Sequence, residues 1–248
     1  MNTMDKARGD PRVQNVLREL SGKVNIKYAA SKHEGWGSNL QNGQATIWWS
    51  RCRHPSASLM HELLHIQLQL KGYRRIRVSI SNIADPETAK RLMDCIDNEM
   101  QHHKFYPDFL SAGFTPDQFY SDSDADIERF LDGEISSGPG STAAASIVFF
   151  SLIAPGGTLP PSAKARLRQR LEALDGGAHS AAFLRIESVV NAWVASTETD
   201  ATDYIRRVLL AVQPSDNLTW YGFEANHRPP NDVGVFADQP FGIREPQE

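Results

Sequence analysis

The sequence predicts an α+β protein, with a small sheet and several helices in residues 1–135 and a mainly helical extension with an irregular tail in residues 136–248. Three observations lead to this class. Apolar residues alternate with a period of two near the N-terminus, and they recur with a helical period in most later segments. A Gly/Ser/Pro-rich break, SSGPGSTAA, separates the two regions. The 248 residues, 40% of them hydrophobic, are enough to form a substantial core.

The first elements follow from local patterns. Residues 11–20 place their apolar side chains on one helical face, and residues 24–28 alternate as a strand does. The pair Asn42-Gly43 is a strong hairpin-turn signal. It is followed by a further strand at residues 44–50.

The stretch SLMHELLHIQLQL places a His-Glu-x-x-His (HExxH) motif on the next helix. Ser56 or Ser58 can cap the start of this helix, which we expect to run to about Leu70 and to end at Gly72. Apolar residues surround the motif, so we expect the helix to be buried. Histidine and carboxylate groups in a buried place need a partner or an ion.

The motif has a direct chemical interpretation as half of a metal site. His61 and His65 are four residues apart and therefore lie on one helical face, where both imidazoles can bind one ion. Glu62 can act as the general base that takes a proton from an attacking water. The alternative is a histidine–glutamate pair satisfied by hydrogen bonds in a core. The apolar surroundings favour a metal site, with zinc as the expected ion.

A second helix is predicted over about residues 85–114, with Asp85 as its cap and with Pro107 disturbing it near its end. It carries the candidates for a third ligand. Glu99 lies on the apolar stripe of this helix and would complete a His-His-Glu set, whereas His102 would complete a set of three histidines. These two are alternatives, and His103 is a further one.

The C-terminal region has helical patterns at residues 143–154, 161–174, 179–196 and 199–212, and an irregular tail is expected from Pro214. The run at 143–154 is too short to span a bilayer, which needs about 20 residues. The net charge of −4, with mixed signs, argues against nucleic acid or a membrane surface as the main partner. Two separated cysteines and an N-terminus without an apolar core favour a cytoplasmic location.

The order of these elements resembles the zincin metallopeptidases: a hairpin ending in GQATIWWS, then HELLH on a helix, then a second helix carrying NE. The NE pair is similar to that of gluzincins, in which the glutamate of the second helix is the third zinc ligand, here Glu99. The compact character resembles the ImmA/IrrE-like branch, whose members act on regulatory proteins in the bacterial cytoplasm. Gln67 departs from the pattern, because that position is usually hydrophobic.

The resemblance implies a zincin-like core in residues 1–135 and a zinc-dependent endopeptidase that hydrolyses a specific intracellular protein. It also implies that the strand before the active helix lies at the edge of the cleft and pairs with the substrate. That role would fall to Ile47, Trp48 and Trp49. The alternative function is a catalytically inactive, metal-binding regulatory module on the same scaffold. Tyr204, Tyr221 and His227 are candidates for a group that stabilises an oxyanion, and no spacing selects one of them.

Overall fold

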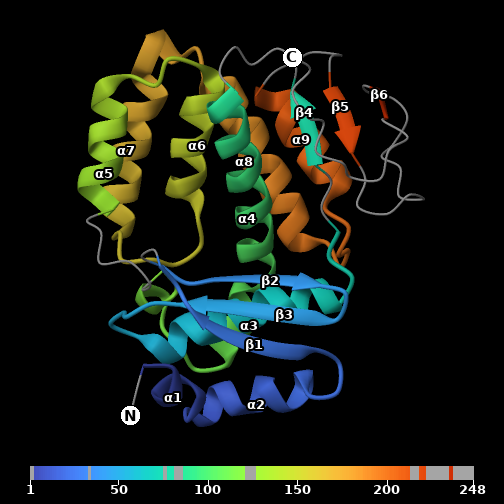
Figure 1. The fold of residues 1–248 in the computed structure, drawn as a ribbon. Helices are drawn as coiled ribbons and strands as arrows, with labels where there is room; N and C mark the ends of the chain where they lie inside the picture. Colours follow the sequence, from blue (N-terminus) through green and yellow to red (C-terminus); the bar gives the residue numbers. More distant parts are fainter. Residues whose placement is uncertain are drawn as a thin grey trace. The chain divides into compact units, whose positions relative to one another are not determined.

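The computed structural model describes residues 3–32, 35–74, 77–80, 86–120, 127–212, 218–221 and 235–236. The chain is α+β, mostly helical, with two small mixed sheets of three strands each among the described residues (Figure 1). Its helices are α1 Thr3–Arg8, α2 Pro11–Leu20, α3 Pro55–Leu70, α4 Pro86–Ser111, α5 Ile127–Ser137, α6 Thr142–Ile153, α7 Pro161–Ala173, α8 Ser180–Ala195 and α9 Thr202–Val212, with short 3-10 turns η1 Pro116–Gln118 and η2 Leu174–Gly177. Its strands are β1 Asn25–Ala30, β2 Gly37–Gln41, β3 Gln44–Trp49, β4 Arg77–Ile80, β5 Leu218–Tyr221 and β6 Val235–Phe236.

The chain forms two compact units that alternate along the sequence. The first contains residues 1–72, 101–133 and 154–165, and the second contains residues 73–100, 134–153 and 166–248. One crossing between them falls next to residue 135, where the sequence predicts a boundary, but each unit is built from three separate segments. Among the described residues, no helix is both long and apolar enough to cross a membrane.

The first unit contains a sheet with the order β1-β3-β2, in which β1 and β3 are parallel and β2 and β3 are antiparallel. The predicted hairpin turn is confirmed: Asn42 and Gly43 both have positive φ, 49° and 71°, as this kind of tight turn requires. β3 is the central strand, so its backbone groups are paired on both sides. The strand expected at residues 44–50, at the edge of the cleft and paired with substrate, is therefore the central strand of this sheet, whose edges among the described strands are β1 and β2.

Helix α3 lies behind this sheet in Figure 1 and packs against β2, α1 and α2. Twelve of its sixteen residues are buried, which confirms the expected burial of the motif. The predicted caps Ser56 and Ser58 lie inside the helix, because the N-cap is His54 with Pro55 in the first position. Gly72, with φ of 96°, ends the helix as predicted.

Helix α4 runs through Pro107 without a break and ends at Ser111, so the expected disturbance does not occur. Phe105 and Phe109 flank the proline and are buried, at 2% and 0% exposure. Their packing offsets the hydrogen bond that proline cannot donate. Asp85, the expected cap, lies outside the described residues.

Helices α6 to α9 match the four predicted segments to within a few residues, and all but the start of α7 belong to the second unit. The aromatic rings of Phe149 and Phe183 stack with centroids 4.5 Å apart, and the indole N–H of Trp193 donates to the carbonyl of Met100 at 2.7 Å. The tail is not wholly irregular, because β5 pairs antiparallel with β4 and parallel with β6. Such pairing links residues far apart in the sequence, which local patterns do not reveal.

Replacing Ile47 by alanine should destabilise the fold by about 2–5 kcal/mol, because this side chain is fully buried on the central strand. The measurement is urea unfolding. Lys27→Ala, on the neighbouring strand and exposed, is the control and should change the stability by less than about 0.5 kcal/mol. Equal stability of the two variants would contradict the core position of Ile47.

Candidate metal centre

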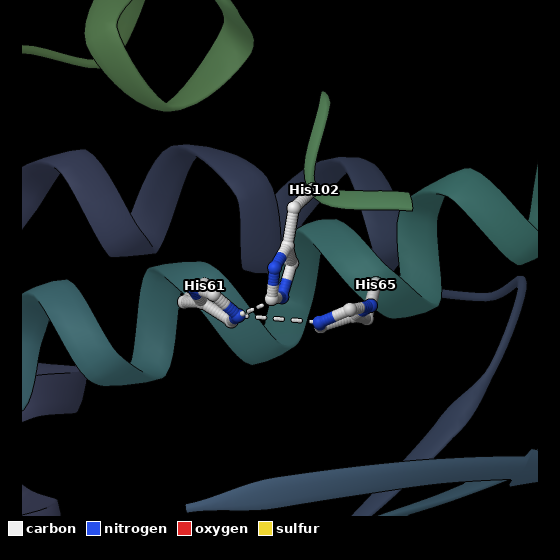
Figure 2. Close-up of side chains that lie close together, drawn as sticks. All are labelled: His61, His65 and His102. Carbon is white, nitrogen blue, oxygen red and sulfur yellow. Dashed lines mark hydrogen bonds between the residues drawn. The ribbon is translucent and has the colours of Figure 1, made fainter. Parts of the chain in front are cut away.

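Three buried histidines of the first unit bring their Nε2 atoms together (Figure 2). His61 and His65 come from consecutive turns of α3, and His102 comes from α4. The Nε2 of His61 lies 3.1 Å from that of His102 and 3.2 Å from that of His65. The three side chains are 9%, 9% and 2% exposed, in the order His61, His65, His102. The predicted pairing of the two motif histidines on one face is therefore confirmed, and His102 joins them.

Each of these histidines uses its other ring nitrogen, Nδ1, for a hydrogen bond outside the cluster. The Nδ1 of His61 donates to the backbone carbonyl of Phe119 at 3.0 Å, since a carbonyl can only accept. The Nδ1 of His65 donates to the side-chain carbonyl of Gln101 at 3.0 Å. The Nδ1 of His102 lies 2.9 Å from the hydroxyl of Tyr120, which can accept its proton.

This pattern leaves the Nε2 atoms of His61 and His65 without a proton, and that of His102 as well when its Nδ1 donates to Tyr120. A neutral imidazole carries one proton, so a ring that donates through Nδ1 presents a bare Nε2. Ligands at about 2.0–2.1 Å from a tetrahedral zinc ion stand roughly 3.3–3.4 Å apart, close to the separations found between these atoms. Metal-bound histidines also characteristically donate their second N–H to a carbonyl or similar acceptor. The donor set and its hydrogen bonds thus fit a divalent metal.

The surroundings of the cluster are aromatic. The ring of Phe105 lies 4.7 Å from that of His65, and the ring of Phe119 lies 4.7 Å from that of His61. Burial, together with the neighbouring histidines, lowers the pKa of His61 and of His102 well below the ordinary 6.5. These two imidazoles are therefore neutral at neutral pH, which is the form that binds a metal.

Of the alternatives for the third ligand, the described residues place His102 in the group and not Glu99. Glu99 lies one turn earlier on α4, is 7% exposed, and is close enough to Cys95 to help raise the pKa of that thiol. His103 is not in the group either. Glu62, next to His61 on α3, is buried at 6% exposure.

The remaining sequence candidates lie elsewhere. Gln67 points away from the cluster, and its amide donates to the carboxylate of Glu19 at 2.8 Å, so its departure from the zincin pattern leaves the site unchanged. Tyr204 belongs to the second unit, where its ring lies 5.0 Å from that of Trp193. The side chain of Tyr221 and all of His227 lie outside the described residues.

Three groups that orient the histidines are absent from the sequence prediction: Gln101, the carbonyl of Phe119, and Tyr120. Gln101 has a weak sequence signal, because it is a polar residue next to His102 on a helix expected to be buried. No sequence signal indicates Phe119 or Tyr120. Every residue carries a backbone carbonyl, so Phe119 does not stand out, and Tyr120 lies after a turn, where no periodic pattern predicts its direction.

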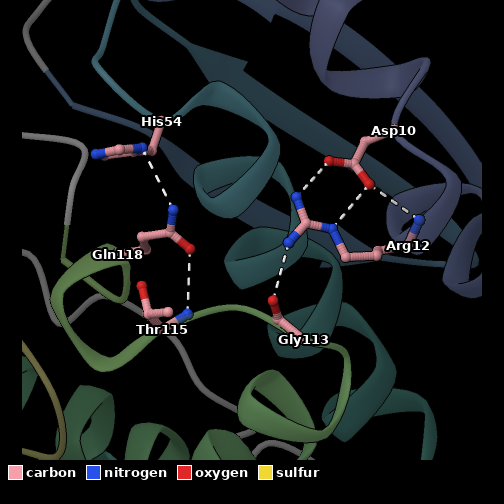
Figure 3. A network of polar contacts seen from close by, with 6 residues as sticks. All are labelled: Asp10, Arg12, His54, Gly113, Thr115 and Gln118. Atoms are coloured by element: carbon pink, nitrogen blue, oxygen red, sulfur yellow. Dashed lines mark hydrogen bonds and ion pairs between the residues drawn. The ribbon is translucent and has the colours of Figure 1, made fainter.

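The segment from Gly113 to Tyr120 carries two of these groups, the carbonyl of Phe119 and Tyr120. Arg12 and His54, from the N-terminal part of the first unit, hold this segment by hydrogen bonds (Figure 3). The guanidinium of Arg12 donates to the carbonyl of Gly113 at 2.9 Å while it pairs with Asp10 at 2.7 Å. The amide of Gln118 donates to the Nδ1 of His54 at 3.4 Å, and its carbonyl accepts from the backbone N–H of Thr115 at 3.1 Å. These bonds fix the position of the segment relative to α2, which carries Arg12, and to the start of α3, whose N-cap residue is His54.

Comparison of the chain with protein-family models, with curated proteins and with solved structures finds no match. The chemistry of the site is therefore inferred from its own residues and geometry.

The choice of ligand predicts a difference between two variants of helix α4. His102→Ala should lose a metal ion that the wild-type chain binds, and Glu99→Gln should retain it, because only His102 points a donor atom into the cluster. The measurement is metal content per chain after equilibration with zinc and removal of the excess. Loss of metal in Glu99→Gln with retention in His102→Ala would reverse the assignment.

The neutral histidines predict acid sensitivity of the metal-free protein. The pKa of His61 and of His102 is lower in the fold than in the unfolded chain, so between the two values the unfolded chain binds more protons. Stability should therefore be constant above about pH 6.5 and fall as the pH drops below it, by up to about 1.4 kcal/mol per pH unit for each histidine.

Urea unfolding from pH 7.5 to pH 5 measures this slope. His102→Asn should reduce it, because one of the two titrating groups is removed. A stability that stays level down to pH 5 would contradict the neutral, buried state of these side chains.

Proposed function

We propose that this protein is a zinc-dependent hydrolase of the HExxH type, and that it is a metallopeptidase acting on a specific intracellular protein. One observation carries the proposal: three Nε2 atoms converge on the motif helix while each Nδ1 is hydrogen-bonded elsewhere. Buried clusters of this kind are costly without an ion. The resemblance of the motif and element order to zincins supports the choice of reaction.

Zinc is the metal that we propose. Imidazole nitrogen suits zinc, copper, iron and nickel, and three histidines are a known ligand set of catalytic zinc. Catalytic zinc sites have three protein ligands and keep one position open, whereas structural sites usually have four. The group formed by the described residues has three members, which favours the catalytic class. When bound, zinc would act as a Lewis acid and lower the pKa of a water molecule, so that its nucleophilic, deprotonated form is available near neutral pH.

Glu62 is the proposed general base. It follows His61 directly in the motif, it is buried, and it is the one carboxylate of the HELLH sequence. A carboxylate in this place can accept a proton from the attacking water and pass it to the leaving amine. His61, His65 and His102 hold the metal in this scheme and take no part in the proton transfer.

Substrate pairing is proposed for β2 and not for β3. Both sides of β3 are occupied, whereas β2 pairs only with β3 among the described strands. The hydroxyl of Ser38, on β2, donates to the backbone carbonyl of Glu62 at 3.5 Å, so this strand lies along the motif. An extended peptide added to the free side of β2 would make backbone hydrogen bonds there. Ile47 is a core residue in this arrangement.

The second candidate function is a metal-binding regulatory module without hydrolytic activity. The observation in its favour is the burial of the cluster, since all three histidines are at most 9% exposed and aromatic rings surround them. A peptidase with this site would rest in a closed state and open for its substrate. The two candidates therefore differ in activity and not in metal content.

Glu62→Gln should keep the metal and abolish cleavage, because the amide cannot accept the proton of the attacking water. The measurement is mass spectrometry of a proteome-derived peptide mixture incubated with zinc-loaded protein. Glu99→Gln, which removes another buried carboxylate, is the matched control and should cleave as the wild type does. Undiminished cleavage by Glu62→Gln would exclude the proposed mechanism, and no cleavage by metal-loaded wild type would favour the regulatory module.

A further inference from the structure

We propose that the Gly156-Gly157 turn is a positioning element for the metal centre, with Gly156 as its key residue. The turn sets the placement of Phe119 and Tyr120, which in turn orient two of the three candidate ligands. This inference rests on the proposed metal function, and it concerns residues far from the motif in the sequence. All of these residues belong to the first compact unit.

The turn touches the ligand-orienting segment directly. The backbone N–H of Gly157 donates to the carbonyl of Pro116 at 2.7 Å. At Gly156 an added Cβ would stand 2.9 Å from that carbonyl oxygen, 2.9 Å from the Cε2 of Tyr106 and 3.1 Å from the Cβ of Phe119. Two of these atoms are backbone or backbone-linked and cannot swing aside as the end of a long side chain can. The absence of a side chain at Gly156 is therefore what allows this approach.

The turn is also anchored on its other side. The ammonium group of Lys164, from the first turn of α7, donates to the carbonyl of Ala154 at 2.7 Å and to the carbonyl of Gly156 at 3.2 Å. The charge makes these bonds stronger than neutral ones. The turn is thus held between Lys164 and Pro116, and it cannot retreat easily if a side chain is added.

The consequence for the metal centre follows from the next residues along the chain. Phe119 accepts the Nδ1 proton of His61 through its carbonyl, and its ring lies against the same imidazole. Tyr120 holds the Nδ1 of His102 through its hydroxyl. A displacement of Phe119 by a few tenths of an ångström moves both anchors together. Loss of such supporting hydrogen bonds typically weakens metal binding by about 10–100-fold.

The test compares Gly156→Ala with Gly176→Ala. Both glycines have a similar positive φ, 70° and 65°, so alanine meets the same backbone strain in each. At Gly176, in the second unit, an added Cβ meets nothing within 4 Å. Zinc affinity is measured by competition with a chelating dye, and urea unfolding of the metal-free proteins gives their stability. Lys164→Met is a second variant, which loosens the turn without adding atoms to it.

We expect Gly156→Ala to bind zinc about tenfold or more weakly than Gly176→Ala, and its metal-free form to be the less stable of the two because only its added Cβ meets other atoms. Lys164→Met should weaken binding in the same direction, and it decides the question if Gly156→Ala does not fold. Equal zinc affinity in Gly156→Ala, Gly176→Ala and wild type would overturn the inference.

A second readout separates this inference from the proposed function. In metal-free protein, the Nδ1–H resonance of His61 reports its hydrogen bond to Phe119 by nuclear magnetic resonance. It should shift or broaden in Gly156→Ala and stay unchanged in Gly176→Ala. Failure of wild type to bind zinc would reject the metal function, and the resonance would still decide the positioning role. An unchanged resonance in Gly156→Ala would reject that role.

Discussion

The convergence of three imidazole Nε2 atoms in a small buried volume is the constraint on which the rest of the first unit depends. The Nδ1 atoms of His61 and His65 donate to carbonyl oxygens, so their Nε2 atoms carry no proton, and the fold holds all three imidazoles in place by packing and by their Nδ1 hydrogen bonds. A metal ion bound by the three Nε2 atoms would stabilise the folded state, since binding that requires the folded site adds to folding stability. Burial and the neighbouring imidazoles lower the pKa of His61 and of His102, so these side chains stay neutral in the core.

The supporting residues have little chemistry of their own. Arg12, His54 and the Gly156-Gly157 turn each contact the segment between Gly113 and Tyr120, and none of them belongs to the group of candidate ligands. Their common effect is to fix a short connection that follows α4 and carries two hydrogen-bond acceptors to the site. The placement of the candidate ligands, which come from two helices, thus depends on contacts with the N-terminal part of the first unit and with a loop before α7. Small displacements there reach the ligands, because protein interiors are closely packed.

The three candidate ligands lie in an enclosed setting, since each is at most 9% exposed. Buried, aromatic surroundings would strengthen electrostatic interactions with a bound ion, and they also restrict access. Among the described strands β2 pairs only with β3, and Ser38 on β2 contacts the motif helix, which is the arrangement that the proposed substrate pairing uses. Activity at such a site would depend on opening, which would suit a peptidase that acts on few intracellular targets.

Local sequence patterns determined much of this protein: the positions of α2, α3 and α6 to α9, the hairpin turn at Asn42-Gly43, and the pairing of His61 with His65 on one helical face. These features depend on periodicity and on turn residues close together in the chain. Only the tertiary structure places His102, and not Glu99, beside His61 and His65, although the helical periodicity puts Glu99 on the apolar stripe of α4. It also decided the central place of β3, the strands in the tail, and the anchoring roles of Phe119 and Tyr120. The physical reason is that ligand convergence and strand order are set by packing between segments distant in sequence, which no local pattern encodes.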